Sequence, residues 1–112
     1  MFALCQFSND FAALRVVSVE AVVVTAASDD DRYDFVSRYF APRHGINEDP
    51  VTGSAHTSLG PYWAAQLGKR DLTGYQASAR GGVVRVHVPE SDATRVTLGG
   101  HAVTIWCGEL LC

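Results

Sequence analysis

One segment of this sequence has the period of a helix, while the segments around it have the composition of strands. Four apolar residues recur at every fourth position and so share one helical face: Ala55, Leu59, Trp63 and Leu67. Gly68 follows as a suitable left-handed C-cap. Pro61 lacks a backbone N–H and is expected to kink this helix or to begin a second segment.

The flanking segments predict strands and one short N-terminal helix. Residues Phe11–Val17 form the expected helix, capped by Asp10 or Asn9. Glu20–Ala26 is rich in β-branched residues and predicts a strand buried on both faces. The alternating segment 33–40 predicts another strand. Turn signals separate four more expected strands, which are Tyr75–Arg80, Val83–Val88, Thr94–Leu98 and Ala102–Cys107.

A helix that is apolar on more than one side needs wide cover, which a curled sheet can provide. We therefore predict an α+β fold in which a mixed or antiparallel sheet wraps around one central helix. The sequence contains no internal repeat or Pro/Gly-rich linker, so we expect residues 1–112 to form a single domain. Hydrophobic residues make up 47% and charged residues 19%, as in globular proteins.

Charge and cysteine content exclude several classes of partner. The formal net charge of −3 gives no basic surface for nucleic acid or for an anionic membrane. No apolar run is long enough to cross a membrane. The three cysteines, Cys5, Cys107 and Cys112, are an odd number without CxxC spacing, and the histidines lack i,i+4 pairing. We expect no disulfide framework and no metal site, and a reducing cytoplasmic location.

The stretch GINEDPVTGSAH, residues 45–56, places an acid, a turn and a helix start within a few positions. Asp49 precedes Pro50 and should be extended, and Gly53 can adopt the dihedrals of a turn. Ser54 is a natural N-cap, so Ser54→Ala is expected to cost about 1 kcal/mol of stability. The first helical amides, at Ser54, Ala55 and His56, would point outward without partners.

Such amides form an anion site that suits a carboxylate, and Asp49 beside it could exchange a proton with a bound small acid. The plainer interpretation of the spacing is that Ser54 only caps the helix and Asp49 only faces solvent. GxSxG, P-loop and GxGxxG motifs are absent from the sequence. His56, in the first turn, is expected to lie on the surface or in the packing rather than in catalysis.

A family resemblance adds to this interpretation. The run YDFVSRYFAPRHGINEDPVTGSAHTSLGPYWAAQLGK, followed by QASARGGVVRVHV and RVTLGGHAVTI, resembles the C-terminal half of the phenazine-biosynthesis PhzF-like isomerases. The similarity extends from about Phe11 onward, and EDPVTGSA is its most specific part. It implies a diaminopimelate epimerase-like fold of two similar halves, each with a sheet wrapped around a central helix. The active site then lies in the cleft between the halves and uses no cofactor.

The resemblance also implies roles for individual residues. Asp49 matches the catalytic, substrate-contacting aspartate, and Gly53, Ser54 and Ala55 match the substrate-binding helix start. In the family the proton-transferring glutamate comes from the N-terminal half, which this sequence does not contain, and Glu48 is not its substitute. The sequence thus resembles a C-terminal domain, a fragment or a truncated reading frame.

Two functional hypotheses follow. The first is a C-terminal domain of a cofactor-independent, biosynthetic isomerase or epimerase that transfers a proton on a small carboxylic acid. The alternative is a catalytically inactive, stand-alone binding or dimerisation domain. Expected partners are a small carboxylate substrate and either the missing N-terminal half or a second copy. In such a homodimer two Ser54 helix starts would face one cleft, each with its Asp49 nearby.

Overall fold

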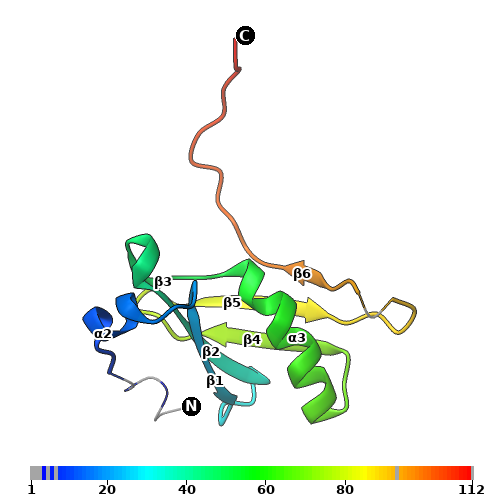
Figure 1. Ribbon diagram of the computed structural model, residues 1–112. Helices are drawn as coiled ribbons and strands as arrows, with labels where there is room; N and C mark the ends of the chain where they lie inside the picture. The colour runs from blue at the N-terminus through cyan, green and yellow to red at the C-terminus, as the bar shows by residue number, and fades with distance from the viewer. Residues whose placement is uncertain (1–3, 5, 7, 93, 112) are drawn as a thin grey trace.

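A mixed sheet and one long helix account for most of the structure, a computed structural model that describes residues 4, 6, 8–92 and 94–111 (Figure 1). The strands of this described part are β1 (Val22–Ala27), β2 (Phe35–Ala41), β3 (Ile46–Asp49), β4 (Asp71–Gln76), β5 (Gly82–His87) and β6 (Thr97–Gly99). The helical elements are α2 (Phe11–Val16), the 3-10 turn η1 (Pro42–His44) and α3 (Gly53–Leu67).

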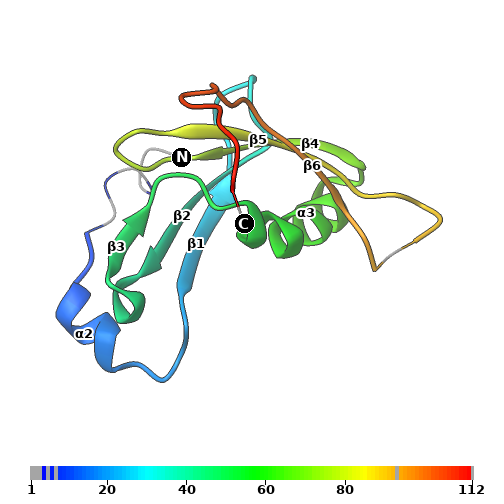
Figure 2. The same cartoon turned by 90° about the horizontal axis from the view of Figure 1, so that it is seen from above.

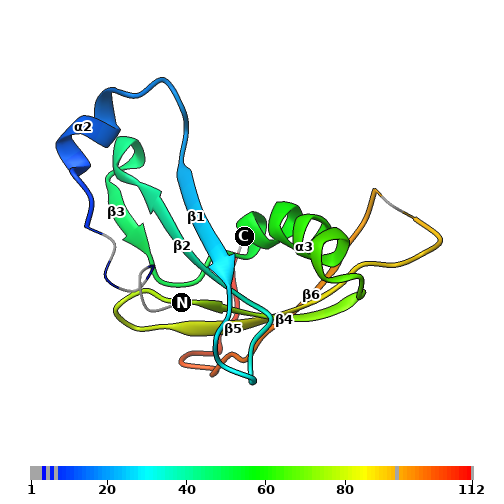
Figure 3. The same ribbon diagram turned by 90° about the horizontal axis from the view of Figure 1, so that it is seen from below.

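The strands follow the order β1-β2-β4-β5-β6, and β3 pairs with β2 outside this path. β2 and β4 are parallel, whereas the other neighbouring strands are antiparallel. Parallel neighbours need a crossover connection, and the segment that carries β3 and α3 supplies it. β1–β3 and β4–β6 meet at an angle with α3 inside it (Figure 3). The predicted α+β fold, a mixed sheet wrapped around one central helix, is confirmed.

The core lies between α3 and the sheet. Its buried residues come from α3, β2, β4 and β5 and are Phe35, Ala55, Leu59, Trp63, Leu72, Val84 and Val86. The Trp63 ring stacks on Phe35 at a centroid distance of 5.8 Å, and its Nε1 donates to Thr25 Oγ1 at 2.9 Å. The helical face predicted from the four-residue period is therefore the face that packs on the sheet, although Leu67 at its end is exposed.

Two glycines fix how α3 lies on the sheet. A Cβ on Gly60 would stand only 2.5 Å from Val86 Cγ1, so the helix can approach β5 closely because this residue has no side chain. Gly68 has φ 66° and its N–H donates to the Ala64 carbonyl oxygen at 2.9 Å, as predicted for the C-cap. α3 continues through Pro61 as one element, so of the two expected effects of Pro61, a kink or a second segment, the second does not occur. Burial of Leu59 and Trp63 on either side of Pro61 stabilises the continuous helix.

The N-terminal predictions are confirmed in their main points. α2 begins after Asp10, whose Oδ1 accepts from the Ala13 N–H at 3.0 Å. β1 is a strand, but the prediction that both its faces are buried is wrong. None of its residues is fully buried, and Val23 is 37% exposed. β1 lies at the end of the strand order, so it has a strand neighbour on one side only.

The strands after α3 differ from prediction in their positions. β5 agrees with the predicted Val83–Val88 within one residue. β4 spans Asp71–Gln76 instead of Tyr75–Arg80, because its residues pair with β2 on one side and β5 on the other. After β4 the chain turns, and Gly81 has φ 73°. β6 is shorter than the predicted Thr94–Leu98 and ends one residue later.

The C-terminal segment 100–111 forms no regular secondary structure, so the predicted strand Ala102–Cys107 is wrong. In Figure 1 this segment leaves the sheet after β6 and extends away from it. Its apolar side chains are highly exposed, with values of 86% for Val103, 93% for Ile105 and 80% for Trp106. A strand forms only against a neighbour, and no strand of the described residues pairs with this segment.

Candidate functional site

The turn from β3 to α3 builds the candidate site. β3 ends at Asp49, and α3 begins at Gly53 after the N-cap Thr52, which has extended dihedrals of φ −117° and ψ 101°. The prediction that Ser54 is the N-cap is therefore wrong, because Ser54 is the second residue of the helix. The Thr52 side chain forms no cap bond to the helix, since its hydroxyl donates to Asp49 instead.

The Asp49 carboxylate lies at the start of α3. Its Oδ2 accepts a short hydrogen bond from Thr52 Oγ1. The Asp49 residue is half-buried, whereas Thr52 is buried. This contact holds the carboxylate beside the helix N-terminus while leaving part of it accessible to a ligand.

A buried glutamine fixes the turn from the neighbouring strand. The Gln76 side chain, from β4, is fully buried, and its Oε1 accepts from the Thr52 N–H at 2.8 Å. Its Nε2 donates to the Asp49 carbonyl oxygen at 2.8 Å and to Thr52 Oγ1 at 3.1 Å. The Thr52 hydroxyl thus accepts from Gln76 and donates to Asp49. Gln76 therefore fixes both the backbone of the turn and, through Thr52, the orientation of the carboxylate.

The first turn of α3 offers three amides to a ligand. A helix start has four amides without helical acceptors, and Gln76 satisfies the one at Thr52. The other three, at Gly53, Ser54 and Ala55, have no acceptor among the residues that the structure describes. Gly53 and Ser54 are exposed, whereas Ala55 is buried, so an anion can reach the first two of these amides most directly. The predicted substrate-binding residues and Asp49 therefore lie together at one end of α3.

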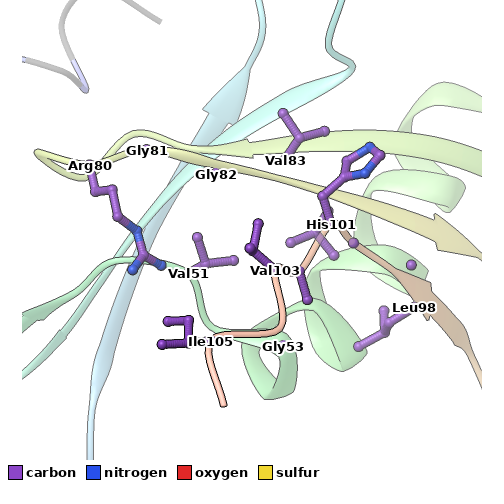
Figure 4. A pocket seen from close by; sticks show the side chains of 14 residues that line it. Val51, Gly53, Arg80, Gly81, Gly82, Val83, Leu98, His101, Val103 and Ile105 are labelled. Carbon is purple, nitrogen blue, oxygen red and sulfur yellow. The ribbon is translucent and has the colours of Figure 1, made fainter. Parts of the chain in front are cut away.

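Two hollows flank this helix start. One, of about 260 Å³, is lined by residues of β1, β2 and α3, namely Val23, Tyr39, Ser54, Ala55, Ser58 and Leu59. The other, of about 690 Å³, lies between the turn before β5 and the C-terminal segment (Figure 4). Its lining includes Val51, Gly53, Arg80, Val103 and Ile105. Gly53 and Ser54 thus border different hollows on the two sides of α3. Figure 2 shows α3 between the strands β1–β3 on one side and β4–β6 on the other.

Glu48 is engaged elsewhere. Its carboxylate accepts from Arg38 Nε at 2.7 Å and from Arg38 Nη2 at 2.8 Å, in a pair that is mostly buried. Successive side chains of a strand point to opposite faces, which separates Glu48 from Asp49. This ion pair agrees with the interpretation that Glu48 is no substitute for a proton-transferring glutamate.

His56 packs inside the first turn of α3. Its Nδ1 lies 2.7 Å from the Thr52 carbonyl oxygen, which can only accept, so Nδ1 carries the proton. Burial lowers the pKa of His56 below its ordinary value of 6.5, opposed by this hydrogen bond. The ring is fully buried beside Phe35, and its Nε2 has no hydrogen-bond partner within the described residues. His56 is therefore a packing residue, one of the two roles expected for it.

Three residues of this site carried no functional assignment in the sequence: Thr52, Gln76 and Tyr39. For Gln76 a signal was present, because it follows Leu72 and Gly74 at alternate positions and these three are the buried residues of β4.

The described residues contain no cluster of three or more His, Cys, Asp or Glu side chains suited to a metal ion. Cys107 is free and exposed, whereas Cys5 and Cys112 lie outside the described residues. None of the described helices has the length and apolar character to cross a membrane.

Comparison with known proteins identifies the family. The family model described as phenazine biosynthesis-like protein matches residues 2–108. An uncharacterized isomerase of Halalkalibacterium halodurans is 44% identical over 108 residues, which are 96% of this chain and 40% of the relative. An uncharacterized isomerase of Pseudomonas aeruginosa is 50% identical over 101 residues, which are 90% of this chain and 37% of the relative.

A solved structure agrees with these matches. The crystal structure of a PhzF-family phenazine biosynthesis protein from Enterococcus faecalis superposes with a TM-score of 0.81 at 44% identity. The superposition covers 88% of this chain and 36% of that protein. The chain thus spans about two fifths of the length of these relatives. With its fold and its sequence in agreement, this chain belongs to the phenazine biosynthesis-like, PhzF-type family, several members of which are named isomerases.

Proposed function

We propose that this chain is the C-terminal domain of a cofactor-independent isomerase or epimerase that transfers a proton on a small carboxylic acid. The observation that carries this proposal is the Asp49 carboxylate beside three amides without acceptors, at Gly53, Ser54 and Ala55. A substrate carboxylate would accept from these amides and would be favoured by the positive end of the helix. Its reacting carbon would then lie within reach of Asp49.

In this mechanism Asp49 is one of two groups that exchange a proton with the substrate. The proton removed from one position must be returned at another position or on the other face. The family resemblance implies a glutamate from an N-terminal half as the second group. The polar chain from Gln76 through Thr52 to Asp49 orients the carboxylate before substrate binds.

Proton exchange in deuterium oxide tests this function. A panel of small amino acids and unsaturated carboxylic acids is incubated with the chain alone, or with the chain plus the remaining part of the Halalkalibacterium relative. We expect deuterium to enter a substrate carbon, detected by proton NMR, mainly in the mixture. Asp49→Asn should remove the exchange, whereas Asp31→Asn, an exposed matched control, should retain it. Equal exchange by the Asp49→Asn mixture would refute the role of Asp49.

A second candidate is a stand-alone binding or dimerisation domain without catalysis. The observation that favours association is the exposed apolar segment with Val103, Ile105 and Trp106, because side chains of this kind are usually covered by a partner. We propose that the partner is a half like the part of the relatives that this chain does not cover or, without such a half, a second copy in a homodimer. We also propose that the chain works in the cytoplasm. Sedimentation at micromolar concentrations and native mass spectrometry test the dimer, and a strictly monomeric profile would exclude it. A dimer without any proton exchange would favour this second candidate.

A further inference from the structure

Two fully buried side chains each carry a polar atom without a hydrogen-bond partner. Among the described residues, no donor or acceptor reaches Ser37 Oγ of β2 or His56 Nε2 of α3. Ser37 is 1% exposed and His56 is 0% exposed. The His56 ring lies against Phe35, at a centroid distance of 5.8 Å. Because nearly all buried polar groups in folded proteins are hydrogen-bonded, these two atoms need a partner.

Ser37 faces α3 from the middle of the sheet. Phe35 and Tyr39, two positions before and after it, pack in the core between sheet and helix. Side chains two residues apart in a strand share a face, so Ser37 points to the same side. Its register partners are Thr25 of β1 and Gln76 of β4, which therefore flank it on the two neighbouring strands.

Contacts of α3 on both sides of Ser37 place His56 opposite it. The helix start is bonded to Gln76, on one side of Ser37. Trp63, further along the helix, donates to Thr25 on the other side. His56 lies between these two contacts along α3, and its buried ring is on the sheet side of the helix. Ser37 Oγ and His56 Nε2 therefore face the same small space between helix and sheet.

The hydrogen-bonding capacity of the two atoms suits a water molecule. His56 Nδ1 donates to the Thr52 carbonyl oxygen, so in the neutral ring Nε2 can only accept, whereas the Ser37 hydroxyl can donate. The two atoms are not bonded to each other, and water commonly bridges polar groups that lie beyond hydrogen-bond distance. Both residues are fully buried, and neither lines the two hollows beside the helix start. The space between them therefore suits a molecule no larger than water.

We propose that one water molecule is bound between Ser37 and His56 as a fixed part of the fold. It accepts a hydrogen bond from the Ser37 hydroxyl and donates one to His56 Nε2. Gln76 holds the N–H of Thr52, and the water, through His56, holds its carbonyl oxygen. Beyond packing, Ser37 and His56 are thus positioning residues for the turn that carries Asp49, and this role does not depend on the proposed function.

Oxygen-17 relaxation dispersion of water tests this site on the 112-residue chain. The method counts water molecules that stay bound for longer than the protein tumbles, and protein hydroxyl groups do not contribute to it. Folded proteins hold about one buried water per 27 residues, so about four are expected here. Ser37→Val removes the hydroxyl and places a methyl group in the space of the water. We expect the dispersion amplitude to fall by about a quarter, the share of one water among about four.

The imidazole ¹⁵N shift of His56 gives a second readout. In the unmodified chain Nε2 should have the shift of a nitrogen that accepts a hydrogen bond, and in Ser37→Val it should move toward the value of a free one. Ser91→Ala is the matched control, because Ser91 is exposed in the connection between β5 and β6. It should change neither the shift nor the amplitude.

A changed Nε2 shift with an unchanged amplitude in Ser37→Val would indicate a direct hydrogen bond between Ser37 and His56 and would overturn the water site. An unchanged Nε2 shift would overturn the link between the two residues, whatever the amplitude. If Ser37→Val does not fold, the unmodified chain decides alone, since a dispersion without long-lived water, or a free Nε2, would refute the proposal.

Discussion

Gln76 offers the sharpest test of how the candidate site is held together. Its side chain is fully buried and makes three hydrogen bonds to the turn between β3 and α3. Thr52 is a buried residue, and replacing Gln76 with alanine removes the acceptor of its N–H. An unsatisfied buried group of this kind costs about 1–3 kcal/mol. The Asp49 carbonyl belongs to a half-buried residue, so water can replace part of its lost bond.

The volume that alanine leaves empty adds about 1 kcal/mol. We therefore expect Gln76→Ala to lower the free energy of unfolding by about 2–4 kcal/mol, a large share of the about 5–15 kcal/mol typical of domains. Gln76→Leu keeps most of the volume and removes only the hydrogen bonds, so it should cost about 1–3 kcal/mol. Urea denaturation measures both values, with the denaturant dependence compared between variants.

Gln66→Ala is the matched control, because Gln66 is exposed on α3 and its replacement should change stability by less than about 0.5 kcal/mol. Hydrogen exchange gives a second readout, since the Thr52 amide should lose protection in Gln76→Leu before the rest of the sheet does. If Gln76→Leu were as stable as Gln66→Ala, the hydrogen bonds of Gln76 would not hold the turn, and the interpretation of this network would be refuted.

Three further outcomes are expected. Stability should fall as the pH drops below about 6.5, because burial lowers the pKa of His56 in the folded chain. Below this pH the unfolded chain binds a proton that the folded chain does not. Urea titrations at several pH values should show a smaller fall in His56→Leu. Gly60→Ala gains about 1 kcal/mol of helix propensity but forces a methyl against the buried, stiff Val86, at a cost of about 1–3 kcal/mol. Its melting temperature should therefore fall. The combined loss of Gly60→Ala and Val86→Ala should be smaller than the sum of the two single losses, whereas additive losses would argue against this contact. Ser54→Ala should cost less than about 0.5 kcal/mol in urea, since Ser54 is exposed and is not the N-cap; a loss near 1 kcal/mol would restore the capping role expected from the sequence.

The parts of the fold that follow from local pattern were predictable from the sequence. The helix α3 was predicted from the four-residue period of Ala55, Leu59 and Trp63, and its end from the glycine at position 68. Both signals are local, because they depend only on residues of the helix itself. The position of β4 depends instead on its neighbours. Glycine is unfavourable in a strand, but a Cβ on Gly74 would stand only 2.5 Å from Phe35 Cζ. The presence of Gly74 in β4 therefore reflects close packing against β2, which the local sequence does not reveal.

The location of the candidate site was predictable from the sequence, but its hydrogen-bond network was not. The order of Asp49, the turn and the helix start is local, and the structure brings these residues together. Thr52 was missed as the N-cap because both Thr52 and Ser54 are suitable residues, and the bonds from Gln76 select between them. The expected strand Ala102–Cys107 has the apolar composition of a strand, but strand formation depends on a neighbour that lies outside the local sequence.

The parallel pairing of β2 with β4 also determines when the site can form during folding. The two strands cannot meet until the chain between them has closed a long loop that contains α3, which is a slow step compared with forming a hairpin. Gln76 lies at the end of that pairing and reaches Thr52 across 24 residues of sequence. During synthesis, the turn that carries Asp49 therefore leaves the ribosome well before the side chain that orders it. We expect Asp49 to reach its final orientation only in the last cooperative step of folding, together with the sheet.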